Sequence, residues 1–287
     1  MVWWQAEISM LKQRVITALI MAGLFLAAIA FLPLPGLALL FGILVGMGAW
    51  EWSRMAGFQS PIARATYVLL VIAGLAAAYL YCQLDDAPPR ELVQPFLGLA
   101  CLWWSFALLW VKGYPDSAVL WRTTAMRCLM GLLILIPAWM SAVYLLSFPQ
   151  GGVLIVVMVI VVATADIGAY FTGKRFGQHK LAERVSPAKT WEGFWGGVVA
   201  CAVLAVLLFY LLPDGAAHIG LVSVVAVTII TGLASVTGDL TVSMVKRESG
   251  VKDSGSLLPG HGGVLDRLDS LSAAAPVFAL GLLLVGW

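Results

Sequence analysis

The sequence predicts an all-α, polytopic integral membrane protein, and three observations support this fold class. Of the 287 residues, 61% are hydrophobic and 11% are charged, whereas about a quarter of the residues in a soluble domain are charged. Apolar runs of about 20 residues recur along the chain, each long enough to cross a hydrocarbon core of about 30 Å as a helix. Along the chain, connections between these runs that contain Lys and Arg alternate with connections that contain almost none. We therefore expect a lipid bilayer as a partner, and no nucleic acid.

Apolar runs predict nine transmembrane segments. They comprise residues 15–32, 37–52, 64–82, 93–111, 127–147, 153–173, 192–212, 221–245 and 268–287. Residues 1–150 are expected to form an N-terminal transmembrane scaffold, and residues 151–287 a C-terminal catalytic transmembrane region with two polar loops. Glu51 and Arg54, at the end of the second segment, are interpreted as an interfacial i,i+3 ion pair. The four cysteines lie singly in or beside apolar runs, which favours free thiols over a zinc site or a disulfide framework.

The distribution of basic residues predicts the orientation. Short cytoplasmic loops of membrane proteins carry an excess of Lys and Arg. With the N-terminus inside, all but one of the 17 Lys and Arg residues fall in cytoplasmic segments. The exception, Arg90, lies in an acidic, proline-containing connection at residues 85–91. The polar loops are therefore expected to face the cytoplasm and the C-terminus the opposite side.

Two acidic residues interrupt predicted transmembrane segments. Asp166 lies in the sixth segment and Asp239 in the eighth, eight and seven residues before Lys174 and Lys246. A charged side chain at the centre of a bilayer costs roughly 2.5 to 3.5 kcal/mol or more, so it is rarely kept without a use. At 1.5 Å per residue, both carboxylates are expected about 10 to 12 Å below the cytoplasmic boundary. We therefore expect them to lie close together.

Two further acids, Asp266 and Asp269, open the ninth segment at i,i+3 spacing, which places them on one helix face. Adjacent carboxylates in a partly dry site repel each other unless a cation lies between them. Together with Asp239 and Asp166 they offer the hard oxygen ligands that Mg²⁺ prefers. The alternative is that both acids are favoured by the helix dipole, with Arg267 as a surface partner.

The first polar loop lies between the eighth and ninth segments. Lys246, Arg247 and Lys252 suit a polyphosphate, although cytoplasmic loops are also basic for topological reasons alone. Gly262 and Gly263 allow the backbone to approach a ligand closely, so that its N–H groups can form an anion-binding concavity.

The second polar loop spans residues 173–197. Ser186, Lys189 and Thr190 are predicted to start a helix whose hydroxyls, lysine and free N–H groups can seat a phosphate. Gly193 and Gly197 form a GxxxG pattern, which permits close helix packing. Because the sequence contains no GxxxxGK[ST] and no GxGxxG after a strand, a P-loop and a dinucleotide-binding fold are excluded.

The polar block at residues 243–269 carries a long motif. It reads Ser243, Lys246-Arg247, Lys252-Asp253-Ser254-Gly255, Leu258-Pro259-Gly260-His261-Gly262-Gly263 and Asp266-Arg267-Leu268-Asp269. This block resembles the complete signature of the phosphatidate cytidylyltransferase (CDP-diacylglycerol synthase) family. The segment SPAKTWEG from Ser186 and the segment DIGAYFTGKRFG from Asp166 are also similar to that family, so the resemblance covers most of residues 160–280.

The resemblance implies an enzyme of phospholipid biosynthesis, a magnesium-dependent nucleotidyltransferase that converts CTP and phosphatidic acid to CDP-diacylglycerol and pyrophosphate. It also implies a homodimer in a bacterial inner membrane with its active site facing the cytoplasm. The resemblance does not fix the number of metal ions, and a second cation could bind near Asp166. The residues and the resemblance together assign catalysis to Asp239, Asp266, Lys246, Arg247, Lys252, Asp253 and His261, substrate binding to Ser186, Lys189, Thr190, Gly262, Gly263 and Arg267, and metal binding to Asp239, Asp266, Asp166 and Asp269.

Two other functions are compatible with the residues. A CTP-dependent transferase resembling a polyprenol kinase would give up the γ-phosphate of CTP and release CDP, not pyrophosphate. An ion-coupled transporter, a different class of protein, would use Asp166 and Asp239 as its coupling acids.

Overall fold

The computed structural model describes residues 2–84, 88–211, 219–257 and 262–287, with the backbone alone for residues 2–14. Its helices are α1 (Val2–Phe31), α2 (Leu34–Met55), α3 (Pro61–Cys82), α4 (Arg90–Lys112), α5 (Ala118–Trp121), α6 (Thr124–Leu146), α7 (Gly151–Phe176), α8 (Trp191–Leu211), α10 (Leu221–Glu248) and α11 (Leu265–Val285). Two short strands, β1 (Lys180–Ala182) and β2 (Ser186–Thr190), lie between α7 and α8.

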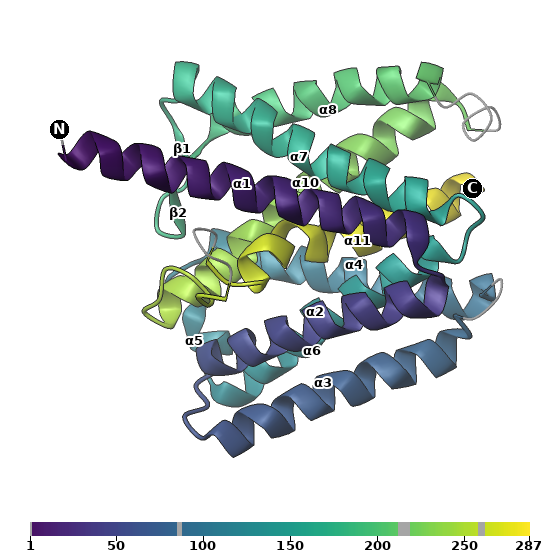
Figure 1. Cartoon of the computed structure of the whole chain (residues 1–287), viewed down its shortest axis with the longest axis horizontal. Coiled ribbons are helices and arrows are strands. Elements are labelled where there is room, and N and C mark those ends of the chain that lie inside the picture. Colours follow the sequence, from purple (N-terminus) through teal and green to yellow (C-terminus); the bar gives the residue numbers. More distant parts are fainter. Residues whose placement is uncertain (1, 85–87, 212–218, 258–261) are drawn as a thin grey trace.

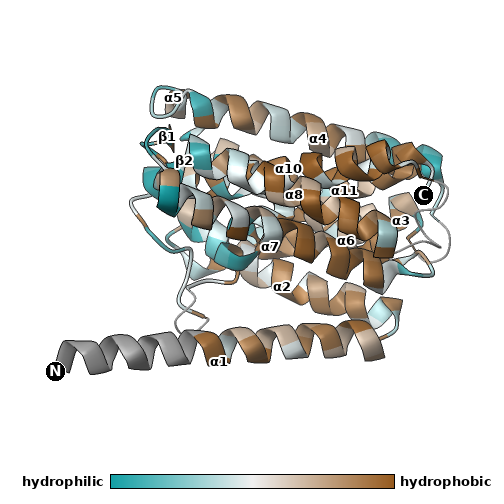
Figure 2. Cartoon of the chain, turned by 90° about the horizontal axis from the view of Figure 1, so that it is seen from above, coloured by the Kyte–Doolittle hydropathy of each residue, from teal (hydrophilic) through white to brown (hydrophobic). Residues whose placement is uncertain are grey.

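The predicted fold class is confirmed. Among the described residues, eight helices are long and apolar enough to cross a membrane, and α1 contains a further apolar stretch, Val15–Phe31. The long helices run side by side (Figure 1). Figure 2 shows hydrophobic residues along the middle of the bundle and hydrophilic residues gathered at the end that carries α5, β1 and β2. The predicted total of nine spans and the side of the N-terminus stay predictions, as does the division at residue 150.

Local sequence explains several helix ends. Pro61 occupies the first turn of α3, where its missing N–H leaves no intrahelical bond unmade. At the other end of α3, Gln83 adopts a left-handed conformation and its N–H donates to the Tyr79 carbonyl. Thr123 caps α6 by accepting a hydrogen bond from the Met126 N–H at 3.3 Å. These caps satisfy backbone groups that the helices themselves leave unpaired.

Helices α7 and α8 pack at close range, as the GxxxG pattern predicts. A Cβ atom at Gly193 would lie 2.7 Å from the Ala169 carbonyl oxygen, and one at Gly197 would lie 2.8 Å from that of Ala165. Larger residues at either position would push α8 away from α7. The predicted packing role of these glycines is confirmed. The four cysteines are free thiols, as predicted.

The second polar loop corrects a prediction about secondary structure. Residues 186–190 form strand β2, antiparallel to β1, with Thr190 opposite Lys180 and Ser186 opposite Ala182. A Ser-Pro pair is also compatible with a helix start, as Ser60 and Pro61 show in α3, but here the antiparallel pairing with β1 keeps the segment extended. The helix begins at Trp191, where the Thr190 hydroxyl oxygen accepts a hydrogen bond from the Gly193 N–H at 3.1 Å. Thr190 therefore caps α8.

Loops from distant parts of the chain are joined at the polar end of the bundle. The Tyr114 hydroxyl, before α5, donates to Glu248 at the end of α10 over 3.3 Å. Burial, and after it the Glu248 carboxylate, raises the pKa of Tyr114, which keeps the hydroxyl protonated as a donor. Arg127, in α6, donates to the Met55 carbonyl at 2.8 Å and to the Ser249 hydroxyl at 3.2 Å. These contacts place the ends of α2, α4 and α10 and the start of α6 together, as the alternation of basic residues predicts.

The orientation can be tested with single cysteines in a cysteine-free background. Ala87→Cys, in the connection before α4 that lies outside the described residues, should be labelled by an impermeant thiol reagent added to intact cells. Asp116→Cys, at an exposed position between α4 and α5, should react only after the membrane is opened. The reverse pattern would overturn the predicted orientation.

Candidate active site at the polar end of the bundle

The loop after α10 folds back so that a lysine on α10 meets an acid on α11. The Lys246 ammonium group contacts Asp266 Oδ1 at 2.8 Å, and the two side chains are only 10% and 6% exposed. Lys246 lies in the last turn of α10 and Asp266 in the first turn of α11. Burial makes each charge dependent on the other, because a buried ion without a partner is strongly unfavourable.

The second oxygen of Asp266 organises the loop. Asp266 Oδ2 accepts hydrogen bonds from the Ser254 N–H and the Gly263 N–H, both at 2.9 Å. Gly262 precedes this turn with a φ of +80°, a conformation that favours glycine. The Gly263 N–H, which was predicted to contribute to an anion-binding concavity, therefore donates to a carboxylate of the protein itself. His261 lies outside the described residues, and the substrate-binding roles of Gly262 and Gly263 stay predictions.

A second acid–lysine pair joins α10 to the hairpin. The Lys189 ammonium group, on β2, contacts Asp239 Oδ2 at 2.5 Å, with side chains 24% and 26% exposed. The Ser243 hydroxyl donates to Asp239 Oδ1 at 3.1 Å from one turn further along α10. This pair is more accessible than the pair of Lys246 and Asp266. A substrate group can therefore reach it with less rearrangement.

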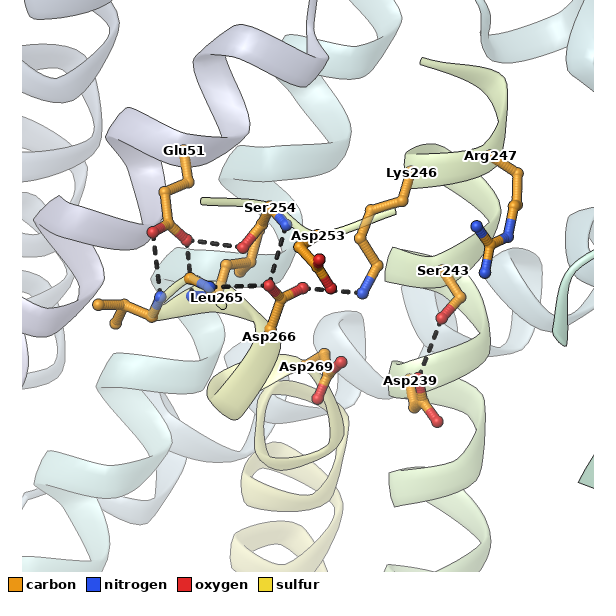
Figure 3. Close-up of polar contacts among 12 residues, drawn as sticks. Glu51, Asp239, Ser243, Lys246, Arg247, Asp253, Ser254, Leu265, Asp266 and Asp269 are labelled. Atoms are coloured by element: carbon orange, nitrogen blue, oxygen red, sulfur yellow. Dashed lines mark hydrogen bonds and ion pairs between the residues drawn. The ribbon is translucent and has the colours of Figure 1, made fainter. Parts of the chain in front are cut away.

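Asp166 and Asp269 extend these pairs into one charged group. Asp166, exposed on α7, lies close enough to Lys189 and Asp239 to interact electrostatically with both. Asp269 lies close enough to Asp239 and Asp266 to interact electrostatically with both. Figure 3 shows it between these two acids. Asp166 and Lys189 line one cavity and Lys189 contacts Asp239, so Lys189 is the common neighbour of the two acids. We call Asp166, Asp239, Asp266, Asp269, Lys189 and Lys246 the acid–lysine cluster.

The cluster has the chemistry of a cation site without preformed metal geometry. Within the described residues, no three His, Cys, Asp or Glu side chains are grouped closely enough to hold a metal ion. Asp239 and Asp266 each contact a lysine. The four carboxyl groups of the cluster come from three helices, and carboxylate oxygens are the ligands that Mg²⁺ prefers. The donor set therefore fits Mg²⁺, and the ligand assignment stays a prediction.

A cavity of about 320 Å³ adjoins the cluster. Asp166, Lys174 and Lys189 contribute its charged walls, and Phe194 and Val236 contribute apolar walls. It lies between α7, the hairpin, α8 and α10. A cavity with both kinds of wall suits an amphiphilic molecule with an anionic head.

The remaining predicted residues lie around the cluster. The Arg247 Nε–H donates to the Val185 carbonyl at 3.2 Å and so joins the end of α10 to the hairpin turn. Lys252, Asp253 and Arg267 are exposed, and Ser186 is partly exposed in β2. Their roles in catalysis and substrate binding stay predictions.

Glu51 is the residue that sequence reasoning missed. The expected ion pair with Arg54 is wrong, because both side chains reach the loop after α10. Glu51 accepts hydrogen bonds from the Ser254 hydroxyl at 2.8 Å, the Val264 N–H at 3.0 Å and the Leu265 N–H at 2.9 Å (Figure 3). Arg54 donates to the Ser254 carbonyl at 2.7 Å. An acid four positions before the end of an apolar helix was the available signal, but its partners lie about 200 residues away in the chain.

The fold and the cluster define a class of protein. A polytopic bundle whose acids and lysines meet in pairs at its polar end, beside an amphiphilic cavity, is a membrane protein with a site suited to anionic ligands. Residues 12–285 match the family described as the Cytidylyltransferase family. The chain belongs to this family.

Three relatives illustrate the similarity. The phosphatidate cytidylyltransferase of Pseudomonas aeruginosa is 46% identical over 278 residues, which cover 97% of this chain and 99% of the relative. The protein of the same name from Haemophilus influenzae is 38% identical, covering 94% of this chain and 98% of its own length. That of Mycobacterium leprae is 40% identical over 144 residues, or 50% of this chain and 45% of its own length.

Proposed function

We propose that this protein is a phosphatidate cytidylyltransferase, which transfers the cytidylyl group of CTP to phosphatidate. The observation that carries the proposal is the similarity, at 46% and 38% identity over nearly the full length of both chains, to relatives that bear this name. The signature at residues 243–269 contributes both partners of the buried pair, Lys246 and Asp266. Neither a CTP-dependent lipid kinase nor an ion-coupled transporter is favoured by these similarities.

The reaction joins two anions. An oxygen of the phosphatidate phosphate forms a bond to the α-phosphorus of CTP, while the bond from that phosphorus to the bridging oxygen of the β-phosphate breaks. The electron pair of the broken bond leaves with pyrophosphate. Because the nucleophile is already anionic, the protein's task is to position the two substrates and to offset their charge.

The lysines of the cluster are suited to this task. Lys189 and Lys246 each contact one aspartate. A substrate phosphate oxygen can take the place of the carboxylate at either lysine, since both are anionic hydrogen-bond acceptors. Each exchange would release a carboxylate oxygen of Asp239 or Asp266. The substrates and the cation are therefore expected to bind together.

Mg²⁺ belongs to this proposal as the cofactor. Asp239, Asp266 and Asp269 would hold it, with Asp166 near enough for a second cation. When bound, the cation neutralises charge on the phosphates of CTP. The protein's own contribution is the arrangement of these acids on α7, α10 and α11, which directs the carboxylates of three helices toward one region.

The amphiphilic cavity suits phosphatidate. Its apolar walls, Phe194 and Val236, would contact the start of the acyl chains, while Lys189 and Lys174 would face the phosphate. CTP would approach from the aqueous side of the loop after α10. The cytoplasmic orientation of this site, location in an inner membrane and a homodimeric assembly complete the proposal.

One assay tests the function. Protein purified in detergent micelles that contain phosphatidate should convert CTP, labelled in the cytosine ring, into a lipid-extractable product in the presence of Mg²⁺, with one pyrophosphate released for each labelled lipid. Release of CDP with phosphorylation of a lipid would instead indicate a kinase. If monodisperse wild-type protein forms no labelled lipid, the proposal is contradicted.

A further inference from the structure

A buried carboxylate on α2 holds the loop that shapes the active site. Glu51 is 3% exposed, and its two oxygens accept hydrogen bonds from the Val264 N–H, the Leu265 N–H and the Ser254 hydroxyl. Val264 and Leu265 begin α11, where unpaired N–H groups and the helix dipole favour an anion. Glu51 thus caps α11 from a different part of the chain. The next residue of α11 is Asp266.

Ser254 connects this cap to the acid–lysine cluster. Its hydroxyl donates to Glu51, its N–H donates to Asp266 at 2.9 Å, and its carbonyl accepts from Arg54 at 2.7 Å. Ser254 is 1% exposed. Every polar group of this residue is therefore directed at either α2 or the active-site aspartate. A shift of Ser254 would move the N–H that orients Asp266.

The loop is closed tightly around the Glu51 carboxylate. A Cβ atom at Gly255 would overlap Glu51, and one at Gly263 would overlap both Glu51 and the Ser254 hydroxyl. These two positions belong to the signature, and the structure explains why they have no side chain: the backbone passes against the carboxylate of α2. The glycines thus shape the Glu51 site as well as the turn around Asp266.

We infer that Glu51 is a positioning residue for the transferase reaction: it fixes Ser254 and the start of α11, and through them the direction of Asp266 toward Lys246. The inference rests on the proposed function for its kinetic consequence. Its structural consequence, local order in residues 251–257 and 262–268, does not depend on that function. An amide in place of the carboxylate would direct an NH₂ group at N–H or O–H donors and would remove the negative charge at the start of α11.

The test compares Glu51→Gln with Glu91→Gln, which removes the same charge from an exposed position at the start of α4. Glu51→Gln should lower kcat by about 10- to 100-fold with a smaller change in KM for CTP, because displacement of a reacting group by about 1 Å can cost that much. Amide hydrogen exchange should speed up in residues 251–257 and 262–268, with the middle of α6 and α7 unchanged. Glu91→Gln should match the wild type in both measurements.

Ser254→Ala provides a second variant, since it keeps Glu51 and removes only one hydroxyl contact. It should show the same local exchange pattern with a smaller loss of kcat. Unchanged exchange in residues 251–257 and 262–268 of Glu51→Gln would overturn the inference. Faster exchange throughout the helices together with a wild-type kcat per folded molecule would also overturn it. Glu51 would then contribute only to the overall stability of the protein. If the wild type made no CDP-lipid, the proposed function would fail while the exchange comparison still decided the role of Glu51.

Discussion

Asp266→Asn is expected to lower the rate of CDP-lipid formation by about 10²- to 10³-fold, the range found when one preorganised electrostatic group is removed from an active site. The amide cannot supply the anionic oxygen that contacts Lys246 at 2.8 Å or serve as an anionic ligand for a cation. The measurement is kcat for labelled CTP with saturating phosphatidate. Asp116→Asn, exposed between α4 and α5, is the matched control and should keep the wild-type rate.

Stability must be separated from catalysis in this experiment. Asp266→Asn leaves Lys246 buried without its partner, which destabilises a folded protein. The double variant Asp266→Asn with Lys246→Met removes both charges and should recover the thermal stability of the detergent-solubilised protein without recovering the rate. A wild-type rate in Asp266→Asn would remove this residue from the active site.

Asp239→Asn and Lys189→Met are each expected to lower kcat/KM by about 100-fold or more, and the double variant should lose much less than the product of the two losses. Residues that act as one unit show this non-additivity. The 2.5 Å contact between Lys189 and Asp239 is the physical reason, because either substitution alone breaks the pair. The measurement is a double-mutant cycle on kcat/KM for CTP.

Two outcomes of the cycle are informative. If the loss of kcat/KM in the double variant equals the product of the two single losses, Lys189 and Asp239 act independently. The assignment of the pair to one site would then be wrong. Lys180→Met is the control for loss of a lysine in the hairpin, since the Lys180 ammonium group donates to the Pro187 carbonyl on the exposed side of β2 and not to the cluster. It should change kcat/KM by less than the Lys189 variant.

Most of the fold could be predicted from hydropathy. Each predicted span lies within one helix of the structure, to within a few residues at its ends. Backbone groups in lipid must be satisfied within their own segment, so a long apolar run implies a helix. The hairpin of β1 and β2 could not be predicted in this way. Its strands are short and polar, so they carry no apolar period, and the phosphate-seat pattern at residues 186–190 was equally typical of a helix start.

Part of the candidate site could also be predicted. The positions of Asp166 and Asp239 in the last three turns of their helices and the spacing of Asp266 and Asp269 follow from helix geometry, which is local. The lysine partners of these acids do not follow from it. Lys189 and Asp239 come from a hairpin and a helix separated by α8, and only the packing of the chain shows that they meet.

The sequence by itself determined that this is a polytopic α-helical membrane protein with a charged site, and its signature placed the chain in its family. Those properties depend on composition, on runs of about 20 residues and on a continuous motif. The tertiary structure alone decided that Lys246 pairs with Asp266, that Lys189 pairs with Asp239, and that Glu51 accepts hydrogen bonds from the loop after α10 and the start of α11. The physical reason is that burial creates these partnerships: Glu51 and Ser254 are 203 positions apart, and no local pattern encodes a contact over that separation.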